Sequence, residues 1–196
     1  MIIFIAMILV AGIAASILIE TMNSLEQQAL KTGRDTMNDV SSGIKVTQIN
    51  GYYNGSKITQ IGIFIRTTAG SSEIDLSETY VTITDTSKDV ILNYTSNVFS
   101  STISNGLFDT VNSSNLTATT FGILKIRDID SSCTSTNPII NNDDLFVLLV
   151  NTTSCFSGIG SRVNVIGNVV PDQGISGVIS FTTPSALIDT IIKLQP

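Results

Sequence analysis

The oxygen-rich residues between positions 128 and 144 are the part of this sequence best suited to chemistry. Asp128 and Asp130 stand two residues apart, and Asn141 to Asp144 follow as two amides and two carboxylates in a row. Calcium takes carboxylate and amide oxygens as ligands, although this spacing matches no EF-hand loop. Acidic pairs in polar loops are also common as solvated turn residues. Two interpretations therefore stay open: a structural calcium ion held by Asp128, Asp130, Asp143 and Asp144, or no cofactor.

Catalytic sets are missing from the sequence. There is no histidine, so neither a Ser-His-Asp or Cys-His arrangement nor a His-ligated zinc site can form. Gly158 and Gly160 lack the rest of a dinucleotide-binding fingerprint, and no Walker-type loop is present. The sequence predicts a protein that is not an enzyme.

The only two cysteines, Cys133 and Cys155, flank one apolar run. A disulfide between them would close a loop of about 20 residues and stabilise the fold by roughly 3 kcal/mol in the chain-entropy model. Two buried free thiols are the alternative. The other signs of an oxidising compartment favour the disulfide.

Five sequons of the form Asn-x-Ser/Thr follow the N-terminal segment, mostly in predicted turns. Together they predict a glycosylated outer surface. The asparagines are Asn54, Asn93, Asn112, Asn115 and Asn151.

The N-terminal segment, residues 1–19, contains no charge and no proline. As a helix it would be about 28 Å long, close to the hydrocarbon thickness of a bilayer. It lacks the basic start of a secretory signal peptide, so we expect it to be retained. A helix that is apolar on every face must be surrounded by lipid or by protein, and small residues allow a close approach between helices. The predicted contact residues are Ile2, Phe4, Ile5, Met7, Ile8, Leu9, Val10, Ala11, Gly12, Ala15, Ile17 and Leu18.

The helix continues beyond this segment in amphipathic form. Apolar residues recur at helical spacing until a stop at Ser41-Ser42-Gly43, where glycine suits a helix C-cap. We therefore predict an N-terminal helical domain over residues 1–42, which packs against other protein or anchors in a membrane, and a second domain over residues 43–196. The stripe consists of Met22, Leu25, Ala29, Leu30, Met37 and Val40.

The second domain has the period of two that is typical of strands. Candidate strands occupy residues 44–49, 58–65, 73–76, 80–84, 90–94, 121–129, 145–150, 163–170, 177–182 and 188–194. Residues 96–120 have weak periodicity and are predicted to be long surface loops, and no helix is expected between the strands. The predicted fold is α+β: a long N-terminal hydrophobic α-helix followed by an immunoglobulin-like antiparallel β-sandwich.

Charge narrows the range of partners. The net charge is −6, and the ten Lys and Arg residues are scattered singly along the chain. Nucleic-acid binding needs a clustered basic surface, so nucleic acid is not an expected partner. Low charge with abundant Ser, Thr and Asn favours an extracellular surface.

Both ends of the chain resemble a known family. The segments IIFIAMILVA at 2–11, TGR at 32–34, SGIKV at 42–46, GNVVPD at 167–172, GISGVI at 174–179 and FTTPSA at 181–186 are similar to those of archaeal flagellins, or archaellins, of the type IV pilin-like superfamily. The resemblance implies a structural subunit of the archaellum filament, used for swimming and located on the cell surface. It also implies copies of itself or a paralogous archaellin as partners, a membrane around the helix before assembly, a prepilin-type peptidase, and assembly and motor machinery.

Two other functions fit the same architecture. An archaeal type IV adhesion pilin would share the helix and the β-domain. Bacterial-type pilins commonly place a glutamate early in the apolar helix, whereas the first acid here is Glu20, which favours an archaellin. A membrane-anchored surface binding domain that never polymerises is the second alternative.

Overall fold

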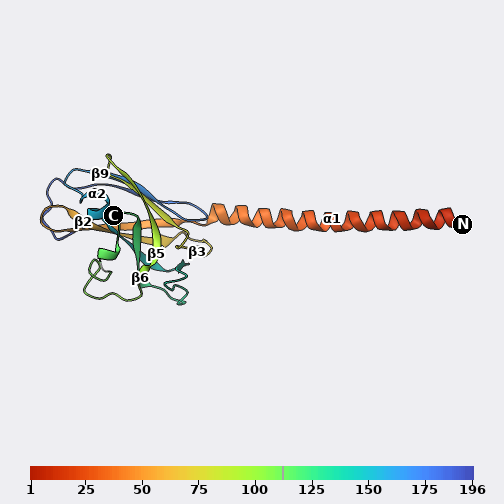
Figure 1. Cartoon of the computed structure of the whole chain (residues 1–196), viewed down its shortest axis with the longest axis horizontal. Coiled ribbons are helices and arrows are strands. Elements are labelled where there is room, and N and C mark those ends of the chain that lie inside the picture. The colour runs from red at the N-terminus through yellow and green to blue at the C-terminus, as the bar shows by residue number, and fades with distance from the viewer. Residues whose placement is uncertain (112) are drawn as a thin grey trace. The chain divides into compact units, whose positions relative to one another are not determined.

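The computed structural model describes residues 1–111 and 113–196, which form two compact units, Met1–Asn38 and Asp39–Pro196. The elements follow one another along the chain as coloured in Figure 1. They are α1 (Ile2–Ser41), β1 (Ile44–Tyr53), β2 (Ile58–Thr67), β3 (Ile74–Asp75), β4 (Tyr80–Thr84), β5 (Asp89–Ser100), the 3-10 turn η1 (Ser113–Asn115), β6 (Thr120–Arg127), β7 (Ile139–Ile140), β8 (Leu145–Asn151), α2 (Thr152–Phe156), β9 (Asn164–Val170), β10 (Gly177–Thr182) and β11 (Ile191–Gln195).

Helix α1 ends where the chain enters the sheet of the second unit. Ser42 and Gly43 are buried, and the Ile175 N–H donates a 2.9 Å hydrogen bond to the Ser42 carbonyl oxygen. Gly174 has a φ of +91°, and a Cβ there would lie 2.2 Å from the same oxygen. Because only glycine tolerates both conditions, the segment around Gly174 holds Ser42 and Gly43 in place within the second unit.

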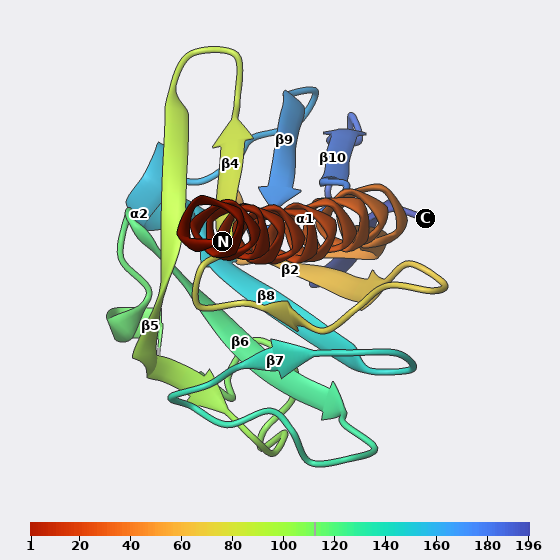
Figure 2. The same cartoon turned by 90° about the vertical axis from the view of Figure 1, so that its right-hand side faces the viewer.

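The second unit is built on one nine-stranded sheet in the order β10-β9-β4-β5-β6-β8-β2-β1-β11, with β3 and β7 forming a separate small pair. All pairings within the large sheet are antiparallel except β5 with β6, which run parallel. Figure 2 shows β4, β9 and β10 on one side of this unit and β2, β8 and β6 on the other. The predicted fold class, a long apolar helix followed by a mostly antiparallel β-domain, is confirmed.

The strand layout differs from the predicted pair of sheets, because β5 joins the two halves into one sheet. Its first part pairs with β4, and its register with β6 shifts between Tyr94 and Phe99. The two ends of the sheet also meet. Gln195 of β11 accepts a 3.0 Å hydrogen bond from the Ser180 N–H and donates a 3.5 Å bond to the Val178 carbonyl on β10. The sheet therefore curves around a single main core to which strands of both halves contribute.

Residues 96–120 are not only surface loops, as the sequence had suggested. Strand β5 continues to Ser100, and the following segment folds back over β6 and β8 to make a second core. The ring of Phe108 lies 5.6 Å from that of Tyr52. The loop is held in place because it buries its own apolar residues. The buried members of this second core are Val98, Phe108, Val111, Leu116, Leu124, Val147 and Leu149.

Candidate functional site

Helix α1 has no buried residue anywhere along its length within the chain. Phe4 is 71% exposed and Met7 is 72% exposed, and the other predicted contact residues are exposed as well. By length and composition α1 is able to cross a membrane. Burying an Ile, Leu or Phe side chain is worth about 1.5–3 kcal/mol relative to water. The apolar half of α1 would therefore be stabilised by lipid or by other protein around it.

Small residues give the apolar half a face that another helix can approach closely. Ala11 and Ala15 stand four residues apart, so they lie on one face, with Gly12 beside them. A Cβ built on Gly12 would meet nothing within 4 Å. Such faces favour helix–helix contact, because backbones can come close without side chains between them.

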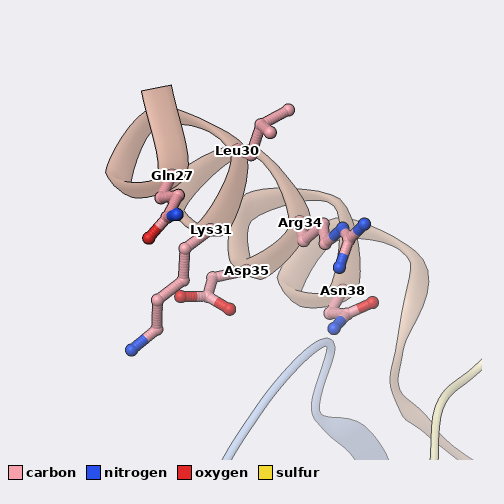
Figure 3. A pocket seen from close by; sticks show the side chains of 6 residues that line it. All are labelled: Gln27, Leu30, Lys31, Arg34, Asp35 and Asn38. Carbon is pink, nitrogen blue, oxygen red and sulfur yellow. The ribbon is translucent and has the colours of Figure 1, made fainter. Parts of the chain in front are cut away.

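The second half of α1 is polar on one side. In Figure 3 the side chains of Gln27, Lys31, Asp35 and Asn38 lie along the lower side of the helix, whereas Leu30 points to the other side. The amphipathic pattern read from the sequence predicts such a polar side. One helix lines this shallow surface from one side only, and it presents no pairing of nucleophile and base. It is suited to contact with another surface rather than to catalysis.

Three carboxylates meet at the ends of β6 and β8. Oxygen atoms of Asp128, Asp130 and Asp144 all lie within 4.8 Å of one another. They meet because β6 and β8 pair antiparallel with Arg127 opposite Leu145, which brings the residues after β6 next to those before β8. The side chain of Asp128 and the whole of Asp144 are buried.

Hydrogen bonds fix two of these carboxylates but leave one oxygen without a partner. Asp144 accepts from the backbone N–H groups of Ile129 at 3.3 Å and Asn141 at 3.1 Å. Oδ2 of Asp128 accepts from the Lys125 ammonium at 3.0 Å and from the Cys133 N–H at 3.3 Å. Oδ1 of Asp128 is buried and has no hydrogen-bond partner among the described residues. A buried carboxylate oxygen without a donor is costly, so it marks a place where a cation would fit.

The cluster also shifts the acidity of its members. Burial raises the pKa of Asp144 above its ordinary value, and the nearby charges of Asp128 and Asp130 add to the rise. Hydrogen bonds from Ser132 and Asn141 lower the pKa of Asp130 to about 2. Three carboxyl groups therefore converge on one place, where burial opposes the charge of Asp144 and hydrogen bonds favour the charge of Asp130.

Asp143, the fourth predicted ligand, stays outside this group of carboxylates. Its backbone adopts a φ of +69°, and its carbonyl oxygen accepts a 2.7 Å hydrogen bond from Arg127 Nε. Two polar side chains complete the cluster. The Asn141 amide donates hydrogen bonds to both Asp130 and Ser132. Ser132 was not among the predicted ligands, and its position two residues after Asp130 is the one sign in the sequence that it could join the cluster.

The disulfide predicted between Cys133 and Cys155 is absent from the structure, where both residues are buried free thiols. Cys155 Sγ lies 4.0 Å from the Ala118 carbonyl oxygen, just before β6, whereas the Cys133 N–H donates to Asp128, just after β6. Strand β6 spans about 23 Å, and a disulfide needs Cα atoms within about 7 Å. The two residues therefore lie at opposite ends of a strand, too far apart to be joined.

The predicted glycosylation sites occupy different surroundings. Asn54 is exposed in the turn between β1 and β2, Asn93 is exposed on β5, and Asn115 is exposed in η1. Asn112 lies outside the described residues. Exposure makes the first three accessible to a modifying enzyme.

Asn151 has a structural role that its sequon did not reveal. It caps α2: its Oδ1 accepts from the backbone N–H groups of Thr153 and Ser154. Its Nδ2 donates to the carbonyl oxygens of Ser113 at 3.1 Å and Leu116 at 3.3 Å. This side chain therefore ties the start of α2 to the loop that covers the second core. Helix α2 itself was not predicted.

A solvent-exposed apolar helix followed by a β-domain with its own core is the architecture of a subunit that assembles, or is anchored, through the helix. Comparison with known proteins identifies the family. A family model described as archaeal-type flagellin matches residues 1–181. The chain is 39% identical to Flagellin B2 of Methanocaldococcus jannaschii, covering 100% of this chain and 92% of that protein. It is 38% identical to Flagellin B4 of Pyrococcus abyssi, covering 100% and 95%.

Solved structures agree with this match. The crystal structure of archaeal flagellin FlaB1 from Methanocaldococcus jannaschii is 29% identical and has a TM-score of 0.71, over 79% of this chain and 97% of that one. The archaeal flagellum of Methanospirillum hungatei strain JF1 shares the fold, with a TM-score of 0.68 over 100% and 96% at 14% identity. The chain belongs to the archaeal-type flagellin family, and it is a structural subunit of the archaeal flagellum.

Proposed function

We propose that α1 forms the core of the archaellum filament by packing against copies of itself or of a paralogous archaellin. The observation that carries this proposal is that an apolar helix without a single buried residue occurs in a chain of this family. Lipid already satisfies such a helix before assembly, so the filament must gain from close helix packing, for which Ala11 and Ala15 are suited. A head-to-tail contact that does not close gives an open polymer.

The proposal places the subunit in the membrane first and in the extracellular filament afterwards. A prepilin-type peptidase and the archaellum assembly and motor machinery would act on it between these stages, and swimming would be the outcome. No catalytic activity is assigned to the subunit itself. An adhesion filament would use the same contacts, whereas a membrane-anchored binding domain would remain monomeric.

Replacing Ala15 by aspartate tests the filament core. Ala15→Asp places a charge where helices would pack, so filaments should be absent while the β-domain stays folded, because neither of its cores contains a residue of α1. Gln27→Asp is the matched control on the polar side and should assemble. Wild-type filament yield from cells carrying Ala15→Asp would refute the proposal.

We also propose a structural calcium ion at Asp128, Asp130 and Asp144. The buried, unpartnered Oδ1 of Asp128 supports it, as does the convergence of three carboxylates near a single ammonium group, that of Lys125. A divalent cation would neutralise their mutual repulsion, and calcium accepts flexible sets of oxygen ligands. Rotation of the Asn141 amide by 180° would add its Oδ1 to the ligand set.

For the outer surface we propose N-glycans at Asn54 and Asn115. Both are exposed, and neither Nδ2 donates a hydrogen bond to a described residue. Asn151 is left out because a glycan would take the nitrogen that holds Ser113 and Leu116. Peptide mass spectrometry of sheared filaments tests the assignment, which fails if Asn151 carries the glycan and Asn54 and Asn115 do not.

A further inference from the structure

The outer face of the four strands β10, β9, β4 and β5 carries exposed apolar side chains among uncharged polar ones, and no described segment of the second unit covers it. Val178 on β10 is 57% exposed and Ile91 on β5 is 56% exposed, and Ile166 on β9 and Tyr80 on β4 are also exposed. The strand register places Val178 beside Asn168, Asn168 beside Thr82, and Thr82 beside Ile91. One row across four strands therefore has an exposed branched side chain at each end.

The other half of the same sheet shows what an outer face of this kind requires. There the loop after β5 covers β6 and β8 and buries Phe108, Val111 and Leu116 against them. Over β10, β9, β4 and β5 no described segment of the second unit does the same, and the apolar side chains stay in solvent. The chain itself therefore covers the outer face of β6 and β8, whereas the outer face of β10, β9, β4 and β5 is open to a partner.

Charge identifies the kind of partner. The outward-facing residues of these four strands are apolar or are Ser, Thr and Asn, with Asp89 as the one charged side chain among them. There is no basic group for a phosphate, so neither nucleic acid nor an anionic lipid surface is suited to it. Each copy of the chain carries a net charge of −6, and like-charged copies approach each other most easily through neutral faces.

Resting on the proposed filament, we infer that this face is the lateral contact between the β-domains of neighbouring copies of this chain. Three inter-strand spacings give it a width of about 14 Å, and strands of about six residues give it a length of about 20 Å. The resulting area of roughly 300 Å² is less than the roughly 800 Å² per partner of a stable independent interface. The face therefore does not hold two copies alone. Once α1 helices are bundled, the high local concentration of β-domains lets a weak contact form.

The inference also bears on glycosylation. Asn93 lies on this same face, opposite Tyr80 in the register of β4 and β5. A glycan at Asn93 would lie over Tyr80 and Ile91 and exclude a second copy. The contact therefore requires Asn93 to be unmodified, unlike Asn54 and Asn115.

Thiol labelling of the full chain tests the contact. The native cysteines are buried, so Ile91→Cys and Val178→Cys each introduce one reactive thiol. We expect maleimide to label each on the order of tenfold more slowly in intact filaments than in detergent-dissociated subunits, since interface cores exclude water. Thr136→Cys, in an exposed loop after β6, measures the labelling rate that filaments allow elsewhere.

Equal labelling rates in filaments and in dissociated subunits at both positions would overturn the contact while leaving the helix core intact, because filaments are still present. A glycan found on Asn93, together with slow labelling of Ile91→Cys in dissociated subunits too, would show that sugar covers the face and would also overturn it. Loss of filaments in Ala15→Asp concerns only the helix, so the two proposals fail separately.

Discussion

Replacing Asn151 separates a structural role from a glycosylation role at one residue. Asn151→Ala removes the cap of α2, worth about 1 kcal/mol, and two donated hydrogen bonds, worth about 1 kcal/mol each. We therefore expect the free energy of unfolding of the β-domain to fall by about 3 kcal/mol. For a domain of this size the melting temperature should fall by roughly 6–12 °C.

Two further variants divide this effect. Asn151→Asp keeps an oxygen that caps α2 but loses both donors to Ser113 and Leu116, so it should be destabilised by about 2 kcal/mol. Thr153→Ala removes the sequon and leaves the Asn151 side chain unchanged, so its stability should stay within about 0.5 kcal/mol of wild type.

Calorimetry of the full chain in detergent measures all three. Near-ultraviolet circular dichroism from the tyrosines, all of which lie in the β-domain, confirms that the transition belongs to that unit. The reasoning is refuted if Thr153→Ala is destabilised as much as Asn151→Ala, since loss of a glycan would then account for both. It is also refuted if Asn151→Ala melts at the wild-type temperature.

Three more predictions concern the thiols, the cation and one close strand contact. Cys133 and Cys155 should resist alkylation in the native protein, because burial raises the pKa of the first to about 12 and of the second to about 11. Both should be alkylated after denaturation without reductant. Protection that persists until reductant is added would show a disulfide. Calcium at a hundredfold excess over its dissociation constant should stabilise the protein by about 2.7 kcal/mol at pH 7. This stabilisation should vanish at low pH, because Asp144, whose pKa is raised, takes up its proton as the pH falls through that pKa. A melting temperature that EDTA does not change at pH 7 would refute the calcium site. Gly167→Ala would place a Cβ against a backbone oxygen of β4, so the free energy of unfolding should fall by about 3 kcal/mol in a denaturant titration. The control Gly160→Ala, where a Cβ would meet nothing within 4 Å, should be neutral. Equal midpoints for the two variants would contradict the packing argument.

Most of the elements could be predicted because their periodicity is local. The apolar run at the N-terminus and the alternation in β4 and β9 each determine one element without help from the rest of the chain. What failed depended on distant contacts. Residues Thr95 to Asn97 have the composition of a turn, yet they lie within β5, which links the two halves of the sheet.

The functional residues divide in the same way. Asp128, Asp130 and Asp144 could be grouped from sequence because they lie near both ends of one β6–β8 connection, which returns them to the same place. Cys133 and Cys155 seemed equally close along the chain, but β6 separates them in space. Asn151 showed a sequon, whereas its cap depended on α2, a helix of five residues with too few turns for a period to be visible.

The separation of the chain into two units explains how the β-domain can fold before the apolar helix has assembled with other helices. Both cores of the β-domain begin at or after Ile44, so the domain has the contacts it needs without any residue of α1. Helix α1 in turn has no buried residue, and under the proposed function its stability comes from its surroundings, first lipid and then its copies. Substitutions in α1 should therefore act on assembly, and substitutions in the cores on folding. Substitutions on the uncovered face of β10, β9, β4 and β5 should act on assembly, as those in α1 do, rather than on folding.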